Sequence, residues 1–339
     1  MVPVIVTPPG SSKIQKETRS PMVQNHFFNQ TSVREFILVG LTEVREIKTL
    51  LFCIFLMFFL ANIIGNVSIL WFVIVDPNLH TSMYFFLGNL SFFDISFSLV
   101  AVPRLLFDLI SHNNTISFHS CLAQMHFFHF LGSSEVTLLT VMSYDRLVAI
   151  SNPLRYSVIM NRKLCVCLVA SAYTIGFLHS LLHTVLAAKL PFCGPNQVKH
   201  FFCDIKPVLI LACTDISLNL KLLTMVTGYL AMTSFLLTFF PYVLICRYVM
   251  KIKTVKGRSR VFSTCSGHLM VAILLFGTAM FTYLGPSSQD VLDQDRAAAV
   301  LFTVITPALN PVIYTLRNKD MKKAISRRMK TPFRNDRKV

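Results

Sequence analysis

Seven long apolar runs dominate this chain, and each is long enough to cross a membrane as a helix. A hydrocarbon core requires roughly 20 consecutive apolar residues in helical form. Barrel strands would alternate apolar and polar residues, whereas these runs are apolar on all sides. The sequence therefore predicts one all-α membrane domain, a seven-transmembrane helix bundle. The runs are 50–74, 83–102, 121–144, 164–188, 222–246, 261–284 and 297–316.

The net charge of +16 is concentrated in particular loops of the predicted topology. With the N-terminus outside, four Lys and Arg residues lie in the second inner loop, six in the third and ten from Arg317 to Lys338. The positive-inside rule therefore predicts an outer N-terminus and a cytosolic C-terminus. The first inner loop, 76–80, has no Lys or Arg and does not contribute. Attraction to lipid headgroups explains most of this charge without nucleic acid, and a basic face for a cytosolic partner is an added hypothesis.

This topology divides the chain into three parts. They are an extracellular N-terminal segment (1–48), a seven-transmembrane domain (49–317) and a basic cytoplasmic tail (318–339). Residues 1–21 are polar and contain proline, so we expect a disordered extension. The apolar stretch Val2–Val6 is too short for a cleavable signal peptide. Translation starts at Met1 or at the alternative Met22.

Four of the nine cysteines fall on the outer side of this topology, namely Cys121, Cys193, Cys203 and Cys213. An even set in an oxidising compartment predicts two disulfides, for which three pairings exist. Asn29 begins the sequon Asn-Gln-Thr on the same side, so we expect an N-linked sugar there.

Two carboxylates, Asp94 and Glu135, fall within apolar runs near mid-membrane. Ionisable groups at that depth are costly and therefore candidates for function. A hydrated Na⁺ between the two carboxylates would relieve their charge, since hard cations take oxygen ligands. The alternative is one protonated, hydrogen-bonded carboxyl. No other cofactor is expected.

A second polar feature closes the third run, where Asp145 and Arg146 mark the aqueous end of the helix. At about 1.5 Å per residue, Arg146 lies roughly 37 Å from Cys121, one bilayer away. In the last run, Pro311 follows Asn310 and predicts a kink. These features indicate a conformational switch that faces a cytosolic partner.

Two histidine pairs invite a metal hypothesis. His126 and His129 share one helix face, and so do His179 and His183. No cysteine or carboxylate stands beside either pair at ligand spacing, which favours polar lining or packing over metal binding. The chain also has no phosphate-binding loop, nucleophile elbow or zinc-hydrolase motif, so we expect it not to be an enzyme.

Several motifs together carry a family likeness. The first set is Gly65-Asn66, Leu90-Ser-Phe-Phe-Asp94, Asp145-Arg146, Asn310-Pro-Val-Ile-Tyr314 and the candidate pair Cys121–Cys203. This set resembles rhodopsin-like G-protein-coupled receptors. The second set is Met83-Tyr-Phe-Phe-Leu87, Met142–Tyr156, His200-Phe-Phe-Cys-Asp204, Phe262–His268 and Pro307–Asn318. It narrows the resemblance to vertebrate olfactory (odorant) receptors, over about Asn29 to Ala324.

The resemblance implies a receptor that binds small volatile odorants within the bundle and activates a stimulatory, olfactory-type G protein, raising cAMP. It implies a multi-pass protein of the plasma membrane, in olfactory cilia. It also implies the disulfides Cys121–Cys203 and Cys193–Cys213. The G-protein switch residues that it implies are Asp145, Arg146, Asn310, Pro311 and Tyr314.

Four positions depart from the family pattern. Leu147 replaces the usual Tyr, Ser82 replaces the Pro before Met83, Ser151 replaces a usual Cys, and Tyr173 stands where many receptors have Trp. Arg146 is retained, so we expect a receptor that is competent to signal.

Residues at helical spacing form candidate pocket stripes near the outer third of the bundle. They are Met125, Phe128, His129, Gly132 and Ser133 on the third helix, Val226, Thr227 and Leu230 on the fifth, Phe276, Met280 and Tyr283 on the sixth, and Thr303 on the seventh. We expect about half of them to serve only helix packing. Tyr283, His129 and Ser133 are the candidates for hydrogen bonds to a ligand.

Two other classes compete with this interpretation. A transporter would show internal repeats, which this sequence lacks, and an insect-type odorant channel would have the opposite orientation. Glycosylation mapping at Asn29 distinguishes the receptor from the insect-type channel, because the two orientations place this residue on opposite sides of the membrane. A receptor for a non-odorant ligand shares every motif, and only a ligand screen with a cAMP reporter separates it.

Overall fold

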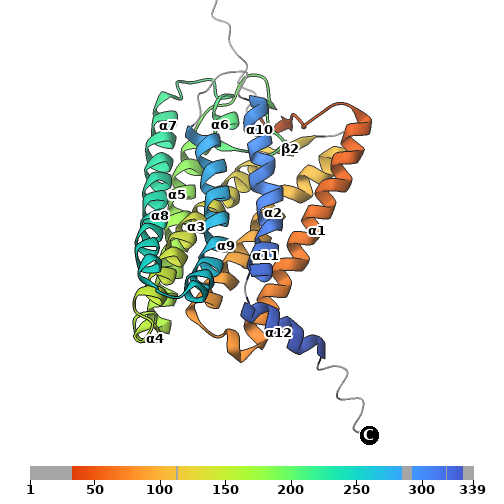
Figure 1. The fold of residues 1–339 in the computed structure, drawn as a ribbon. Coiled ribbons are helices and arrows are strands. Elements are labelled where there is room, and N and C mark those ends of the chain that lie inside the picture. The colour runs from red at the N-terminus through yellow and green to blue at the C-terminus, as the bar shows by residue number, and fades with distance from the viewer. Residues whose placement is uncertain (1–32, 112–113, 285–291, 318, 331–339) are drawn as a thin grey trace, which may run out of the picture. The chain divides into compact units, whose positions relative to one another are not determined.

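The computed structural model describes residues 33–111, 114–284, 292–317 and 319–330, which form a bundle of long helices (Figure 1). The long helices are α1 (Arg45–Val75), α2 (Ser82–Ile110), α3 (Phe118–Ser151), α5 (Arg162–Ala188), α8 (Gly228–Lys251), α9 (Val255–Leu284) and α11 (Thr306–Arg317). Two of the long helices, α8 and α11, each continue a shorter helix and a π-helical turn. Helix α8 follows α7 (Ser217–Leu222) and the turn η2 (Leu223–Thr227). Helix α11 follows α10 (Leu292–Val300) and the turn η4 (Leu301–Ile305). Each predicted apolar run lies within one of these helical segments.

Five helices in the described part of the chain are long and apolar enough to cross a membrane. They are Arg45–Val75, Ser82–Ile110, Arg162–Ala188, Ser217–Lys251 and Arg296–Thr315. In α9 the apolar stretch is shorter, Cys265–Met280. Helix α3 differs because it carries polar groups such as Glu135 and Arg146, and it packs against α2, α5, α8 and α9. A helix that other helices surround need not be apolar, because little of it faces lipid.

Close contact between α3 and α5 depends on Gly176. A Cβ at this position would lie 2.1 Å from Ser134 Oγ and 2.6 Å from the carbonyl oxygen of Phe130. Gly65 has the same role on α1, where a Cβ would lie 2.7 Å from Pro311 Cβ. Because glycine alone permits such approach, these two positions bring α5 against α3 and α1 against α11.

A three-stranded sheet lies at one end of the bundle. Its central strand β1 (Glu35–Leu38) pairs antiparallel with β2 (Thr115–Ser117) and parallel with β3 (Gln197–Val198). Phe36 and Leu38 on β1 are buried, whereas Glu35 is exposed. No strand was predicted here, because the strands are very short and pair across long sequence separations.

The other end of the bundle carries η1 (Pro77–Leu79), α4 (Tyr156–Ile159) and the basic helix α12 (Lys319–Lys330) (Figure 1). Arg327 on α12 donates to Asp76 Oδ2 at 2.8 Å, and Met321 and Ala324 on the same helix are buried. Helix α12 therefore packs its apolar face on the bundle.

Candidate functional site

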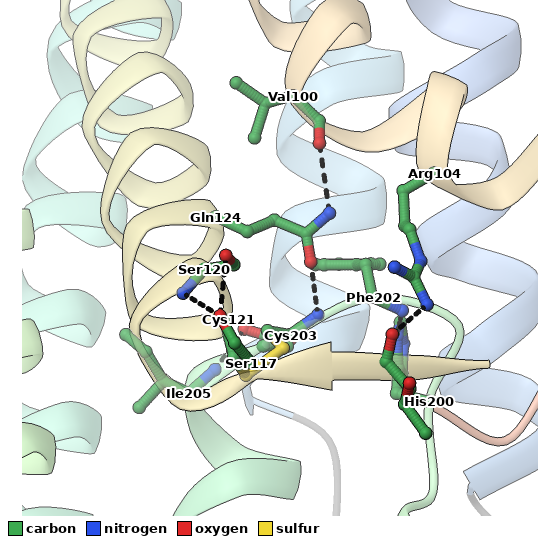
Figure 2. The surroundings of a disulfide bond; sticks show 12 residues. Val100, Arg104, Ser117, Ser120, Cys121, Gln124, His200, Phe202, Cys203 and Ile205 are labelled. Carbon is green, nitrogen blue, oxygen red and sulfur yellow. Dashed lines mark hydrogen bonds between the residues drawn. A yellow bond between two sulfur atoms is a disulfide. The ribbon is translucent and has the colours of Figure 1, made fainter. Parts of the chain in front are cut away.

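Two disulfides hold the loop between α5 and α7. Cys121 bonds Cys203, and Cys193 bonds Cys213, which are the pairs that the resemblance implies. Gln124, one turn from Cys121, adds a polar bridge (Figure 2). Its Nε2 donates to the Val100 carbonyl at 3.0 Å, and its Oε1 accepts from Cys203 N at 2.9 Å. Gln124 was not predicted as a site residue, although its i+3 spacing from Cys121 places both residues on one face of α3.

A buried polar contact continues this attachment one residue further. Asp204 Oδ1 lies 2.8 Å from His129 Nε2 and also accepts from Ile205 N, at the start of α6 (Ile205–Leu209). Burial alone would raise the pKa of Asp204, but the hydrogen bond and the charge of His129 outweigh it and hold that pKa below its usual value. Asp204 is thus a carboxylate that ties the loop to α3.

Aromatic side chains fill the space beneath this loop. Phe201 and Phe202 are almost fully buried, and the Phe202 ring lies 4.4 Å from the Phe128 ring, centroid to centroid. His200 packs against both rings, and burial lowers the pKa of its imidazole to about 4. Residues 200–203 therefore form a buried, mainly aromatic cluster that packs on α3.

One cavity lies in the bundle beside Phe128. It leaves about 60 Å³ for the centre of a water-sized molecule. One water needs only about 10–15 Å³ on that measure, so several waters or one small organic molecule fit. The lining residues are Phe128, His129, Gly132, Ser133 and Val136 on α3, His179 on α5, Thr227, Gly228, Leu230 and Ala231 at the junction of η2 and α8, Ala279 on α9 and Phe302 on η4.

Half of the predicted pocket residues line this cavity, namely Phe128, His129, Gly132, Ser133, Thr227 and Leu230. The structure does not bring Met125, Val226, Phe276, Met280 or Thr303 to it. Met125 instead packs in the cluster that contains the Cys121–Cys203 disulfide, and Phe276 packs against Phe235. Thr303 Oγ1 donates to the Ala299 carbonyl of its own helical segment. The side chain of Tyr283 lies outside the described residues, as does Asn29.

Five lining residues were not predicted, namely Val136, Gly228, Ala231, Ala279 and Phe302, whereas His179 was expected to be polar lining or packing. Val136 simply extends the α3 stripe by three residues. Gly228, Ala231 and Phe302 lie in or just after a π-helical turn, which inserts an extra residue and rotates the rest of the helix. Thr227 ends η2 and Phe302 lies in η4, so both irregular turns present a side chain to the cavity.

One histidine of each pair makes hydrogen bonds with hydroxyl groups, whereas His129 contacts the Asp204 carboxylate. His126 Nδ1 lies 3.0 Å from Ser180 Oγ, and both ring nitrogens of His179 contact hydroxyls. No group of three or more His, Cys, Asp or Glu side chains within the described residues is arranged to hold a metal ion.

At the other end of α3, Arg146 donates to Asp145 Oδ2. Asp145 Oδ1 also accepts from Ser82 Oγ at 2.9 Å and from the Tyr156 hydroxyl at 2.7 Å. The departure at position 82 thus supplies a hydrogen bond that proline cannot make. Asp145 is held from α2, α3 and α4 at once.

A third polar cluster surrounds Asp94 in the bundle core. Asn310 Nδ2 donates to both carboxylate oxygens of Asp94, at 2.9 and 3.1 Å. Asp94 and Glu135 are both buried and repel each other electrostatically. Such a site fits a hard cation such as Na⁺, because further oxygens are also available. Among the buried oxygens that have no hydrogen-bond partner within the described residues are Asn66 Oδ1, Ser91 Oγ, Asn310 Oδ1 and the Tyr314 hydroxyl.

The apolar helices and the enclosed polar groups define an α-helical, multi-pass membrane protein. A family model described as "Olfactory receptor" matches residues 52–331. Human olfactory receptor 12D1 is 49% identical over 303 residues, which cover 89% of this chain and 95% of that protein. Human olfactory receptor 12D2 is 48% identical over 300 residues (88% and 98%), and mouse olfactory receptor 10D3 is 46% identical over 299 residues (88% and 95%). The chain belongs to the olfactory receptor family, so it is a receptor and not an enzyme.

The low pKa of His200 makes the stability of this fold depend on pH. Between about pH 6.5 and 4 the unfolded chain binds a proton at this residue and the folded chain does not, so stability falls as the pH falls. We expect the unfolding free energy to drop by about 1 kcal/mol from pH 7.5 to 5.5 through this group. In thermal unfolding of the purified receptor, the loss of stability between pH 7.5 and 5.5 should be smaller for His200→Asn than for the wild type. The exposed His119→Asn should keep the wild-type drop, and an unchanged drop in His200→Asn would contradict the assignment.

Proposed function

We propose that this protein binds small volatile odorants in the cavity beside α3 and activates a stimulatory, olfactory-type G protein at the other end of the helix, raising cAMP. The observation that carries the proposal is the position of α3. Its residues Phe128, His129, Gly132 and Ser133 line the cavity, and Asp145 and Arg146 lie near its far end. Membership of the olfactory receptor family supports both halves.

We further propose seven membrane spans, an outer N-terminus and a cytosolic C-terminus, in the plasma membrane of olfactory cilia. Two observations support this orientation. The disulfides lie at the end of the bundle that carries the sheet, and disulfides persist in oxidising compartments. The basic helix α12 lies at the opposite end, where the positive-inside rule places cytosolic segments.

In the proposed mechanism a ligand shifts the population of two bundle arrangements. A ligand does so only to the extent that it binds one arrangement more tightly. In the active arrangement the inner end of α9 moves outward, and Arg146 exchanges its Asp145 contact for one with the G protein. Ser82 and Tyr156 oppose that exchange by holding Asp145 in place.

Loss of the Arg146 guanidinium should abolish signalling without preventing expression. In cells that report cAMP, Arg146→Ala should reach the surface and give no odorant-driven signal. An N-terminal epitope, stained on intact cells, measures surface level and tests the proposed orientation in the same experiment. Arg45→Ala, an exposed arginine at the start of α1, is the matched charge control and should respond normally. An intact cAMP response in Arg146→Ala would refute the proposed role.

Removal of the Ser82 hydroxyl should raise signalling in the absence of ligand. Hydrogen bonds to charged groups contribute about 1.5–3 kcal/mol, so losing this one should increase the active population on the order of 10-fold. Ser82→Ala tests this, and Ser82→Pro should act alike, because proline is accepted at the first position of a helix. Ser151→Ala is the control, since its hydroxyl contacts the neighbouring Asn152. Basal cAMP equal to wild type in both Ser82 variants would count against the mechanism.

We also propose that the polar cluster around Asp94 holds Na⁺. Asp94, Glu135, Ser91 and Asn310 would supply ligands, and the ion would supply positive charge between two buried carboxylates. An ion that binds only the folded state stabilises it by mass action. Replacing sodium by choline should therefore lower the melting temperature of the purified receptor, and Asp94→Asn should lose this dependence. Equal melting temperatures in both salts for the wild type would exclude the ion.

A further inference from the structure

We infer that the cavity selects uncharged ligands that carry a hydrogen-bonding oxygen, and that this oxygen binds to a hydrogen-bond chain formed by Ser133, His179 and Thr227. The inference rests on the proposed function, because it names the ligand class for the same cavity. Two features support it: the hydrogen-bond pattern of the three side chains and the absence of available charge in the described lining.

The three side chains come from different elements and form one continuous chain. His179 Nδ1 on α5 lies 2.9 Å from Ser133 Oγ on α3, and His179 Nε2 lies 3.0 Å from Thr227 Oγ1 at the end of η2. All three residues line the cavity. The π-helical turn brings Thr227 to this position, and such turns recur at functional sites.

The positions of the protons in this hydrogen-bond chain determine which hydrogen bonds it can make with a ligand. A neutral imidazole donates from one nitrogen and accepts at the other. If Nε2 donates to Thr227, then Ser133 donates to Nδ1, and the Thr227 proton remains for a ligand. If Nδ1 donates instead, the Ser133 proton remains. In either tautomer one hydroxyl is a donor and the other retains lone pairs, so the chain accommodates a carbonyl, ether or hydroxyl oxygen at either end.

The rest of the lining disfavours a charged ligand. No Lys, Arg, Asp or Glu is among the described residues that line the cavity. The carboxylate of Asp204, which contacts the lining residue His129, is already engaged there and at the start of α6. A buried ion without a partner is strongly destabilised, so an ammonium or carboxylate ligand would enter at high cost. The apolar walls, formed by side chains such as Val136, Leu230 and Phe302, suit the hydrocarbon part of the ligand.

The test has two stages, and the first compares ligand classes on the wild-type receptor. Two matched sets share one carbon skeleton and differ in their polar group: octanal, octanol, octane, octylamine and octanoic acid, and cyclohexanone, cyclohexanol, cyclohexane, cyclohexylamine and cyclohexanecarboxylic acid. A wider library of volatiles with equal numbers of each class is screened next. We expect cAMP responses to the uncharged oxygen compounds. A preference for amines, acids or hydrocarbons would overturn the inference and leave the proposed function standing.

The second stage removes single hydroxyls with near-isosteric variants and measures the best oxygen-bearing agonist from the first stage. Ser133→Ala and Thr227→Val should each raise the half-maximal concentration about 10-fold, the loss expected for one hydrogen bond. An unchanged surface level, measured with the N-terminal epitope on intact cells, separates lost recognition from misfolding. Thr303→Val and Ser151→Ala are controls, since neither residue lines the cavity or contacts the hydrogen-bond chain. Equal shifts in the controls, or none in either Ser133 or Thr227 variant, would overturn the role of this hydrogen-bond chain.

A receptor that reaches the surface but is silent to the whole library fails at an earlier step. That outcome contradicts the proposed function and removes the basis of the inference. The two failures are thus distinguished in one assay.

Discussion

The enclosure of α3 by its neighbours is the constraint on which the rest of this structure depends. This helix carries histidine, glutamate, aspartate and arginine side chains that would be costly against lipid. Packing against α2, α5, α8 and α9 removes that cost. Gly176 makes the closest of these contacts possible, because any side chain there would meet Ser134. The cavity, the disulfide and the Asp145–Arg146 pair are all attached to this one enclosed helix.

The helices were predictable because lipid imposes a length and a composition that are visible in any window of the sequence. The switch pair was predictable for the same reason, since two adjacent charges can only close an apolar run. The residues that line the cavity were only partly predictable on two of the helical segments. On the seventh segment Phe302 lines the cavity in place of Thr303. On the fifth segment Thr227 and Leu230 line it as predicted, but Gly228 and Ala231 do so as well and Val226 does not, because a π-helical turn rotates each of these helices. Periodic spacing assumes a regular helix and therefore fails there.

The four departures from the family pattern have unequal structural meaning. Ser82 contributes a hydrogen bond to Asp145, and Tyr173 packs its ring 4.7 Å from that of Phe93. Leu147 joins the small apolar cluster that contains Tyr242 and Cys265. Nothing in the structure explains Ser151. The first three changes are therefore accommodated by contacts that differ from one another in kind: a hydrogen bond, a ring contact and aliphatic packing.

The central position of β1 in its sheet has a consequence for how the receptor is made. Ribosomal synthesis delivers this strand first, whereas its partners β2 and β3 emerge about 80 and 160 residues later. One edge of β1 therefore gains its partner strand after α2 has been made, and the other edge only after α5 has been made. The loop that supplies β3 also contains Cys203, whose bond partner Cys121 has already been translated. The sheet and this disulfide therefore cannot be completed until α1, α2, α3 and α5 have all been synthesised, although α8, α9 and α11 are still to come.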